Sequence, residues 1–185
     1  MMKHLMVSLC AVIAAFCSVG TGLAQNCSDP EACNYNPAFE GGVLNAPCLF
    51  VETVAEHSTG DLAGMTTYRV YFQAEMATDF VTSVFGNLST PLTLTTTTTF
   101  YQNELGSASS ASQNPLLFAG FPDLVYDSYV TIGLSETANA AAGESNPSLV
   151  PSPNQDWIAA FDPGGGAAGT DIIINDLVGG IWYIF

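Results

Sequence analysis

The sequence predicts a mainly β chain: an antiparallel β-sandwich or jelly-roll-like domain, preceded by a signal peptide and a short cysteine-rich turn segment. Apolar and polar residues alternate over residues 66–74, where Tyr68, Val70 and Phe72 share one side, as in a half-buried strand. Residues 95–99 are consecutive threonines, and β-branched side chains disfavour a helix and suit a pleated strand. Both observations indicate β-structure.

Further short strands are expected between loops rich in Gly, Pro and Ser. The expected strands cover residues 80–85, 92–100, 125–134, 157–161, 171–175 and 180–185, and turn-rich stretches cover residues 106–115, 138–153 and 163–169. The sequence shows no long amphipathic helix and no repeat of fixed period, which disfavours helical bundles, solenoids and propellers. Short strands with polar loops are typical of sandwiches and jelly rolls.

The N-terminal residues have the three parts of a cleavable secretory signal peptide. Lys3 supplies a basic start, an apolar run covers residues 5–19, and the small residues Gly22 and Ala24 precede the expected cleavage site. A retained membrane anchor is the alternative, but the apolar run is shorter than the ~20 residues that a spanning helix needs. We therefore expect residues 1–24 to be removed and the chain to be secreted or held at the cell surface.

Composition divides the chain into four segments. These are residues 1–24 as signal peptide, 25–50 as a cysteine-rich module, 51–65 as a linker, and 66–185 as the β-sandwich-like domain. The last five residues, 181–185, are apolar and no turn or polar tail follows them. Because a terminal apolar strand leaves an exposed edge, we expect the β-domain to be truncated at its C-terminus.

The charge of the chain limits its partners. It has 17 acidic and 2 basic residues, a formal net charge of −15, and Arg69 is the one basic residue after the signal peptide. Nucleic-acid binding requires clustered Lys and Arg, so nucleic acids are excluded as partners, and anionic membranes are disfavoured for the same reason. After cleavage no membrane span is expected. Glycans, other extracellular proteins and divalent cations stay open as partners.

Three cysteines remain in the mature chain, and all lie near its start. Cys27, Cys33 and Cys48 are disulfide candidates, because clustered cysteines in an exported protein are usually oxidised. Their odd number leaves one thiol free or paired outside this stretch. Zinc is the alternative, but three thiols without a nearby histidine make a poor four-ligand site.

Residues 27–37 read CSDPEACNYNP. This stretch resembles the CTDPxACNYNP cysteine modules that precede β-rich domains in secreted proteins of marine Bacteroidota. The sequence departs from that pattern over residues 44–47, where the usual acidic turn is missing, and the spacing to Cys48 is longer. The resemblance implies secretion and implies no particular chemistry.

No catalytic constellation is present, so we expect a non-enzymatic chain. A Ser or Cys nucleophile needs a base, and His57 is the only histidine after the signal peptide. Residues 164–169 satisfy G-x-G-x-x-G, but a strand pattern follows where a nucleotide site needs a helix. Pairs of carboxylates are too frequent in this acidic chain to indicate glycoside hydrolysis.

The sequence offers one candidate metal site, for calcium. Asp162, Asp171 and Asp176 flank a glycine-rich connection, and calcium prefers carboxylate and carbonyl oxygens. If the strands expected at 157–161 and 171–175 pair, the first two carboxylates converge. The alternative is that all three are solvated loop acids or strand-end caps.

Several aromatic residues have two interpretations, as a sugar-stacking face or as core. They are Tyr126, Tyr129, Trp157, Trp182 and Tyr183, and their apolar neighbours favour the core. The favoured function is therefore a non-enzymatic structural or adhesive module of a larger secreted or surface protein. The alternative is a glycan- or calcium-binding accessory module attached to a secreted enzyme.

The signal peptide gives the first testable prediction. The secreted protein should begin at Gln25, because Gly22 and Ala24 fit the small-residue positions before a signal-peptidase site. Mass spectrometry of the N-terminal peptide measures this directly. A secreted form that still carries Met1 would contradict the prediction.

Overall fold

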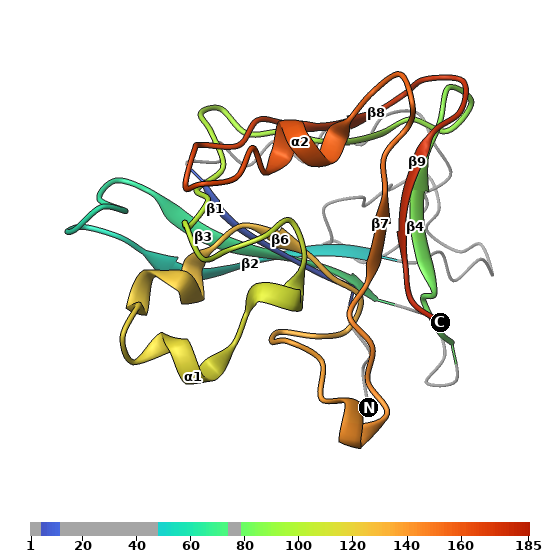
Figure 1. The fold of residues 1–185 in the computed structure, drawn as a ribbon. Helices are drawn as coiled ribbons and strands as arrows, with labels where there is room; N and C mark the ends of the chain where they lie inside the picture. The colour runs from blue at the N-terminus through green and yellow to red at the C-terminus, as the bar shows by residue number, and fades with distance from the viewer. Residues whose placement is uncertain (1–4, 12–47, 74–78) are drawn as a thin grey trace, which may run out of the picture.

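The computed structural model describes residues 5–11, 48–73 and 79–185 (Figure 1). The strands are β1 (Leu5–Ala11), β2 (Cys48–Glu56), β3 (Thr66–Gln73), β4 (Ser83–Gly86), β5 (Leu92–Leu94), β6 (Tyr129–Val130), β7 (Ser148–Val150), β8 (Ile172–Ile174) and β9 (Gly180–Tyr183). Two short helices are α1 (Pro115–Phe118) and α2 (Trp157–Phe161), and 3-10 turns cover Ser110–Ser112, Pro122–Tyr126 and Ala140–Ala142. Within these described ranges no helix is long and apolar enough to cross a membrane.

The strands form three antiparallel sheets. The sheet orders are β2-β3-β1-β6, β4-β9-β7 and β5-β8. In Figure 1 the strands of the four-stranded sheet run across the view, whereas β4, β9 and β7 stand nearly vertical at its right-hand end. The prediction of a mainly β chain with antiparallel sheets is confirmed.

Strand β2 extends into the segment that the sequence marks as a linker, residues 51–65. Its Glu52 is opposite Arg69 of β3, and the hydroxyl of Tyr71 donates a hydrogen bond of 2.6 Å to Glu52 Oε2. Such cross-strand pairs stabilise a sheet, so the irregular connection is confined to residues 57–65.

Residues 157–161 form the helix α2, so the prediction of a strand there was wrong. Asp156 precedes the helix, and its Oδ1 accepts the backbone N–H of Ala159 at 3.1 Å, which caps the first turn. Trp157 and Phe161 are four residues apart on one helical face, and both are buried. A run of five residues is too short for its periodicity to separate a buried strand from a buried helix.

The threonine run, residues 95–99, is not a strand either. β5 ends at Leu94, and the backbone N–H of Thr96 then donates to Asp171 Oδ1 at 3.0 Å. The N–H of Thr98 donates to the side-chain oxygen of Thr96 at 3.3 Å. These backbone N–H groups thus donate to side-chain oxygens and not to the carbonyl oxygens of a neighbouring strand. Hydroxyl side chains such as that of threonine often compete in this way with β-sheet hydrogen bonds.

The other expected strands are found in full or in part. Those expected over residues 66–74, 80–85, 171–175 and 180–185 correspond to β3, β4, β8 and β9. Within residues 125–134 only Tyr129–Val130 is a strand, because the 3-10 turn that starts at Pro122 runs to Tyr126.

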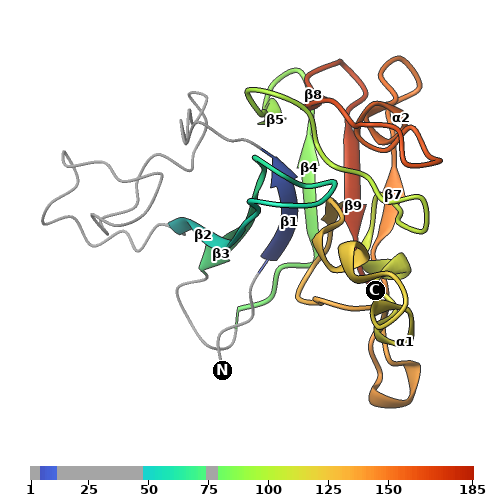
Figure 2. The same ribbon diagram turned by 90° about the vertical axis from the view of Figure 1, so that its left-hand side faces the viewer.

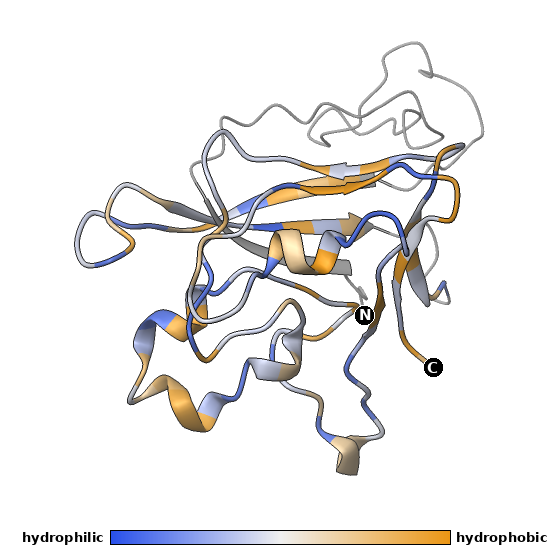
Figure 3. Cartoon of the chain, turned by 45° about the horizontal axis from the view of Figure 1, so that its top comes forward, coloured by the Kyte–Doolittle hydropathy of each residue, from blue (hydrophilic) through white to orange (hydrophobic). Residues whose placement is uncertain are grey.

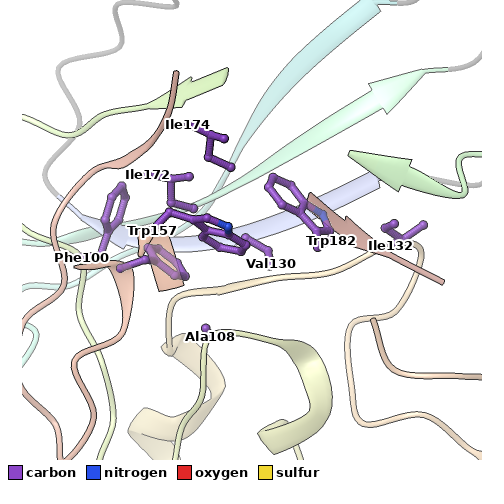
Figure 4. Packing of buried hydrophobic residues seen from close by; sticks show 9 residues of the cluster. Phe100, Ala108, Val130, Ile132, Trp157, Ile172, Ile174 and Trp182 are labelled. Carbon is purple, nitrogen blue, oxygen red and sulfur yellow. The ribbon is translucent and has the colours of Figure 1, made fainter. Parts of the chain in front are cut away.

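The core lies where α2 meets the three sheets (Figure 4). Its buried members are Phe100, Ala108, Val130, Ile132, Trp157, Phe161, Ile172, Ile174 and Trp182. The rings of Trp157 and Trp182 lie 5.5 Å apart, and those of Phe100 and Phe161 lie 5.3 Å apart edge to face. Such pairs are worth about 0.5–1.5 kcal/mol each beyond the area they bury. The core interpretation of Trp157, Trp182 and Tyr129 is confirmed.

Close packing at Gly169 gives a prediction for the fold. Gly169 and Phe100 exchange two backbone hydrogen bonds of 2.9 Å, and a Cβ at residue 169 would lie 1.8 Å from the carbonyl oxygen of Phe161. Since backbone must move to admit a methyl group, Gly169→Ala should lower the free energy of unfolding by about 3 kcal/mol. Thermal or urea unfolding measures the loss.

The matched control is Gly120→Ala, where the nearest atom to an added Cβ, the carbonyl oxygen of Leu117, is 3.8 Å away. It should change stability by no more than about 0.5 kcal/mol. Equal stability of the two variants would contradict the packing at Gly169.

Candidate functional site

Two of the three aspartates predicted to bind calcium, Asp162 and Asp171, serve separate loops. Asp162 ends α2, and its Oδ1 accepts the N–H of Gly164 at 3.0 Å. Asp171 precedes β8, and its Oδ1 accepts the N–H of Thr96 at 3.0 Å. The two carboxylates were predicted to converge at the end of two paired strands, but the first of these segments, residues 157–161, is the helix α2.

The third aspartate, Asp176, also holds a loop. Its Oδ1 accepts the N–H of Gly179 at 2.7 Å, and its Oδ2 accepts the hydroxyl of Ser152. The bond from Ser152 is the main cause that lowers the pKa of Asp176. In the described part of the chain no three His, Cys, Asp or Glu side chains lie close enough to hold a metal ion. Calcium binding by these aspartates stays a prediction.

A pocket of about 300 Å³ lies beside α2 and β8. It is lined by Gln155, Asp156, Trp157, Ala160, Thr170, Asp171 and Ile173. The indole of Trp157 is 1% exposed, and its Nε1–H donates to the carbonyl oxygen of Val150 at 3.2 Å. The ring is therefore part of the core and offers no face on which a sugar could stack. The polar groups that line the pocket are the carboxylates of Asp156 and Asp171, the amide of Gln155 and the hydroxyl of Thr170.

His57 and the glycine-rich loop have structural surroundings. The Nε2 of His57 lies 2.8 Å from Thr67 Oγ1, and its ring packs edge-on against Tyr126 with centroids 4.4 Å apart. Residues 164–169 follow the helix α2 and precede the strand β8. A dinucleotide site has the opposite order, strand before helix.

Of the three disulfide candidates, Cys27 and Cys33 lie outside the described residues. Cys48 is the first residue of β2. The disulfide therefore stays a prediction.

Sequence reasoning did not identify the carboxyl of Asp127 as a buried group. Its side chain is fully buried, its Oδ1 accepts the N–H of Asn103 at 2.8 Å, and its Oδ2 accepts the amide N–H of Gln113 at 3.3 Å. Gly106 leaves room for the carboxylate, since a Cβ there would lie 2.1 Å from Oδ2. The group thus holds together loop residues far apart in the sequence, and no local pattern around Asp127 marks it.

The pKa of Asp127 is raised to about 7, mainly by burial and to a smaller extent by the nearby charge of Asp162. Backbone hydrogen bonds from Asn103, Ser107 and Ser128 act in the opposite direction. A pKa near neutrality is also found in acid–base catalysts. Because the side chain of Asp127 is inaccessible and its oxygens receive bonds from the surrounding loop, its surroundings fit a structural group.

The outer side of the β4-β9-β7 sheet carries an apolar face, defined as Phe85, Val150, Ile181, Tyr183 and Phe185. Phe85, Ile181 and Val150 are in register across the three strands. Phe85 is 53% exposed, Val150 44% and Phe185 99%, and the ring of Phe185 meets that of Tyr183 at 5.0 Å. None of the three strands contains a charged residue. Figure 3 shows the apolar character continuing to the end of the chain.

Two loops at the other end of the sheet also expose apolar side chains. The N–H of Leu88 donates to the carbonyl oxygen of Asp176 at 2.7 Å, which joins the loop after β4 to the loop before β9. These loops expose Leu88, Leu177 and Val178, with Leu177 at 81%. Large exposed apolar patches mark interaction sites in soluble proteins.

Comparison of the chain with family models, with curated proteins and with solved structures finds no match. The site is therefore interpreted from its own geometry.

The buried Asp127 gives a prediction of pH dependence. A carboxyl whose pKa is raised from 3.8 to about 7 on folding contributes its full stability at pH below about 4, and this contribution is lost as pH rises through 7. The free energy of unfolding that this carboxyl contributes is roughly 4 kcal/mol at most. In Asp127→Asn the amide oxygen can still accept from Asn103, but the group no longer titrates. The free energy of unfolding, measured with urea, should therefore differ less between pH 5 and pH 8 in this variant than in the parent protein.

The control variant is Asp61→Asn, which removes one charge at an exposed position. It should keep the pH dependence of the parent protein, since it removes the same single charge as Asp127→Asn but leaves the buried carboxyl in place. If Asp127→Asn also kept the full pH dependence, the buried carboxyl would not be its source.

Proposed function

We propose that the chain is a non-enzymatic extracellular module with a β-sandwich-like body, which gives structure or adhesion to a larger secreted or surface protein. The observation that supports this most is the apolar face of the β4-β9-β7 sheet. A sheet of an isolated antiparallel domain usually turns polar side chains to water on its outer side. Here the register row of Phe85, Ile181 and Val150 is apolar from edge to edge.

The charge distribution supports a contact role for this face. The chain carries 17 acidic residues, yet β4, β9 and β7 contain none of them. Charged side chains are depleted at the centre of protein interfaces, because burying them without partners costs free energy. The acidic remainder keeps the chain soluble while one uncharged surface is free to associate.

The chemistry of the face favours a protein partner or an apolar surface over a glycan. Sugars need hydrogen-bonding groups beside an aromatic ring, whereas this face pairs Phe85 with the aliphatic Ile181 and Val150. The polar residues nearest to this face, Ser83 and Ser148, lie at one end of their strands, in register with Tyr183. Burial of aliphatic and aromatic side chains would contribute about 25 cal/mol per Å².

A glycan- or calcium-binding accessory module is the second candidate. The pocket beside α2 favours it, because Asp156, Asp171 and Gln155 bring oxygen and amide groups together there. It ranks second since Trp157 presents no free ring face and since Asp171 already accepts the N–H of Thr96.

The proposal predicts that polar substitutions on the apolar face weaken attachment. Beads coated with the mature protein should attach to alkylated glass and to the surface of the cells that secrete it. The double variant Phe85→Thr/Val150→Thr should reduce the number of attached beads about tenfold. A tenfold loss corresponds to about 1.4 kcal/mol, within reach of two half-exposed apolar side chains. Threonine suits a strand, so the fold should persist, which circular dichroism checks.

The matched control is Phe121→Thr, because Phe121 is 50% exposed, close to the 53% of Phe85, but precedes a 3-10 turn outside this sheet. Attachment should be unchanged in this variant. Equal losses in both variants would show that attachment depends on general hydrophobicity, and unchanged attachment in the double variant would remove the basis of the proposal.

A further inference from the structure

Strand β1 occupies an inner position in the four-stranded sheet. Its seven residues pair with β3, from Leu5 opposite Phe72 to Ala11 opposite Thr66, and Val7 and Ser8 also pair with β6. Figure 2 shows β1 beside β3, with β2 on the far side of β3. β1 therefore joins β6 to the rest of this sheet.

The residues of β1 lie within the segment predicted to be removed at export, residues 1–24. Without them β3 and β6 would lose their shared neighbour, and the N–H and C=O groups along these edges would lose their partners. Val130 of β6 is fully buried and Val70 of β3 packs against the same core, so water would reach apolar surface as well. Removal of residues 1–24 would therefore leave a vacancy between β3 and β6, defined as the position of β1 in this sheet.

The vacancy has the dimensions of one strand. Neighbouring strands lie about 4.8 Å apart, so the space between β3 and β6 admits an extended segment and is too narrow for a helix about 10 Å wide. Any strand placed there runs antiparallel to both neighbours if it repeats the pairing of β1.

We infer that the exported chain accepts, between β3 and β6, an extended apolar strand from a different polypeptide. Adding a strand to an open sheet edge is a common mode of peptide recognition. The sequence of β1, LMVSLCA, shows that an uncharged strand of about seven residues suits the position. Opposite Arg69, where β1 has Ser8, a hydrogen-bond acceptor fits best, because the Nε of Arg69 is buried and has no partner among the described residues.

A second copy of this chain is a poor donor. Among the described residues β2 is an edge strand of the same sheet, but it carries Glu52 and Glu56 and has a register shift between Thr53 and Ala55. Donation would also bring together two chains that each have a large negative charge. The partner strand is therefore expected to come from a different protein, neutral or basic in charge.

The test uses the mature chain, residues 25–185, with Cys27, Cys33 and Cys48 replaced by serine, and a synthetic peptide of residues 3–12. Saturating peptide should raise the melting temperature by about 5 °C. Cys10 of the peptide is in register with Thr67, so a Thr67→Cys chain should form a disulfide with it. The control Thr53→Cys lies on β2, which pairs with β3 and not with β1, and should form none.

A peptide with Val7→Pro is the second control, because Val7 is opposite both Val70 and Val130 and proline removes the backbone N–H. It should leave the melting temperature unchanged. If the mature chain folds only when refolded with the parent peptide, the inference is supported.

Three results would overturn the inference. One is a mature chain whose melting temperature is unchanged by the peptide and whose Thr67→Cys variant forms no disulfide with it, whether or not the chain folds alone. Another is a dimer in which hydrogen exchange shows β3 protected without peptide, because a second copy would then fill the space. The third is a secreted protein that retains Leu5–Ala11, which fills the position from within the chain. None of these depends on the apolar face, so the proposed function is tested separately.

Discussion

The contact between Trp157 and Trp182 connects the parts of this molecule. The two rings lie 5.5 Å apart, and the indole N–H of Trp157 donates to Val150 of β7. Gly180 makes the approach possible, since a Cβ there would lie 2.7 Å from Nε1 of Trp157. One side chain of α2 therefore fixes two strands of the β4-β9-β7 sheet. At the other end of α2, Phe161 packs against Phe100 and extends the same core.

Because the core fills one side of the β4-β9-β7 sheet, the composition of its other side becomes informative. Val84 and Leu149 flank Trp182 in register and pack inward, whereas Phe85 and Val150 flank Ile181 on the outer side. Both sides are apolar, a pattern of sheets that are covered on both faces. The outer side is nevertheless exposed, with Phe85 and Val150 about half accessible to water. Contact with another surface is therefore the favoured role of this side.

The sequence predicts the elements whose information is local, and misses those that depend on distant partners. The period-two pattern of residues 66–74 and the apolar residues before Phe185 identify β3 and β9. Helix α2 is missed because five residues carry too little periodicity, and its stability comes from the Asp156 cap and from burial. Asp127 is missed for a different reason: its partners Asn103 and Gln113 are 24 and 14 residues away. In the sequence it is one acid among many.

The scarcity of basic residues explains how the acids are used. Arg69 is the one lysine or arginine in the described ranges, so few carboxylates there can be neutralised by ion pairs. Asp156, Asp162 and Asp176 instead accept backbone N–H groups at turns and helix ends, where such donors otherwise lack partners. Asp127, which is buried without a cation, has a raised pKa. Salt therefore screens mainly repulsion in this chain, and moderate ionic strength should favour the folded state.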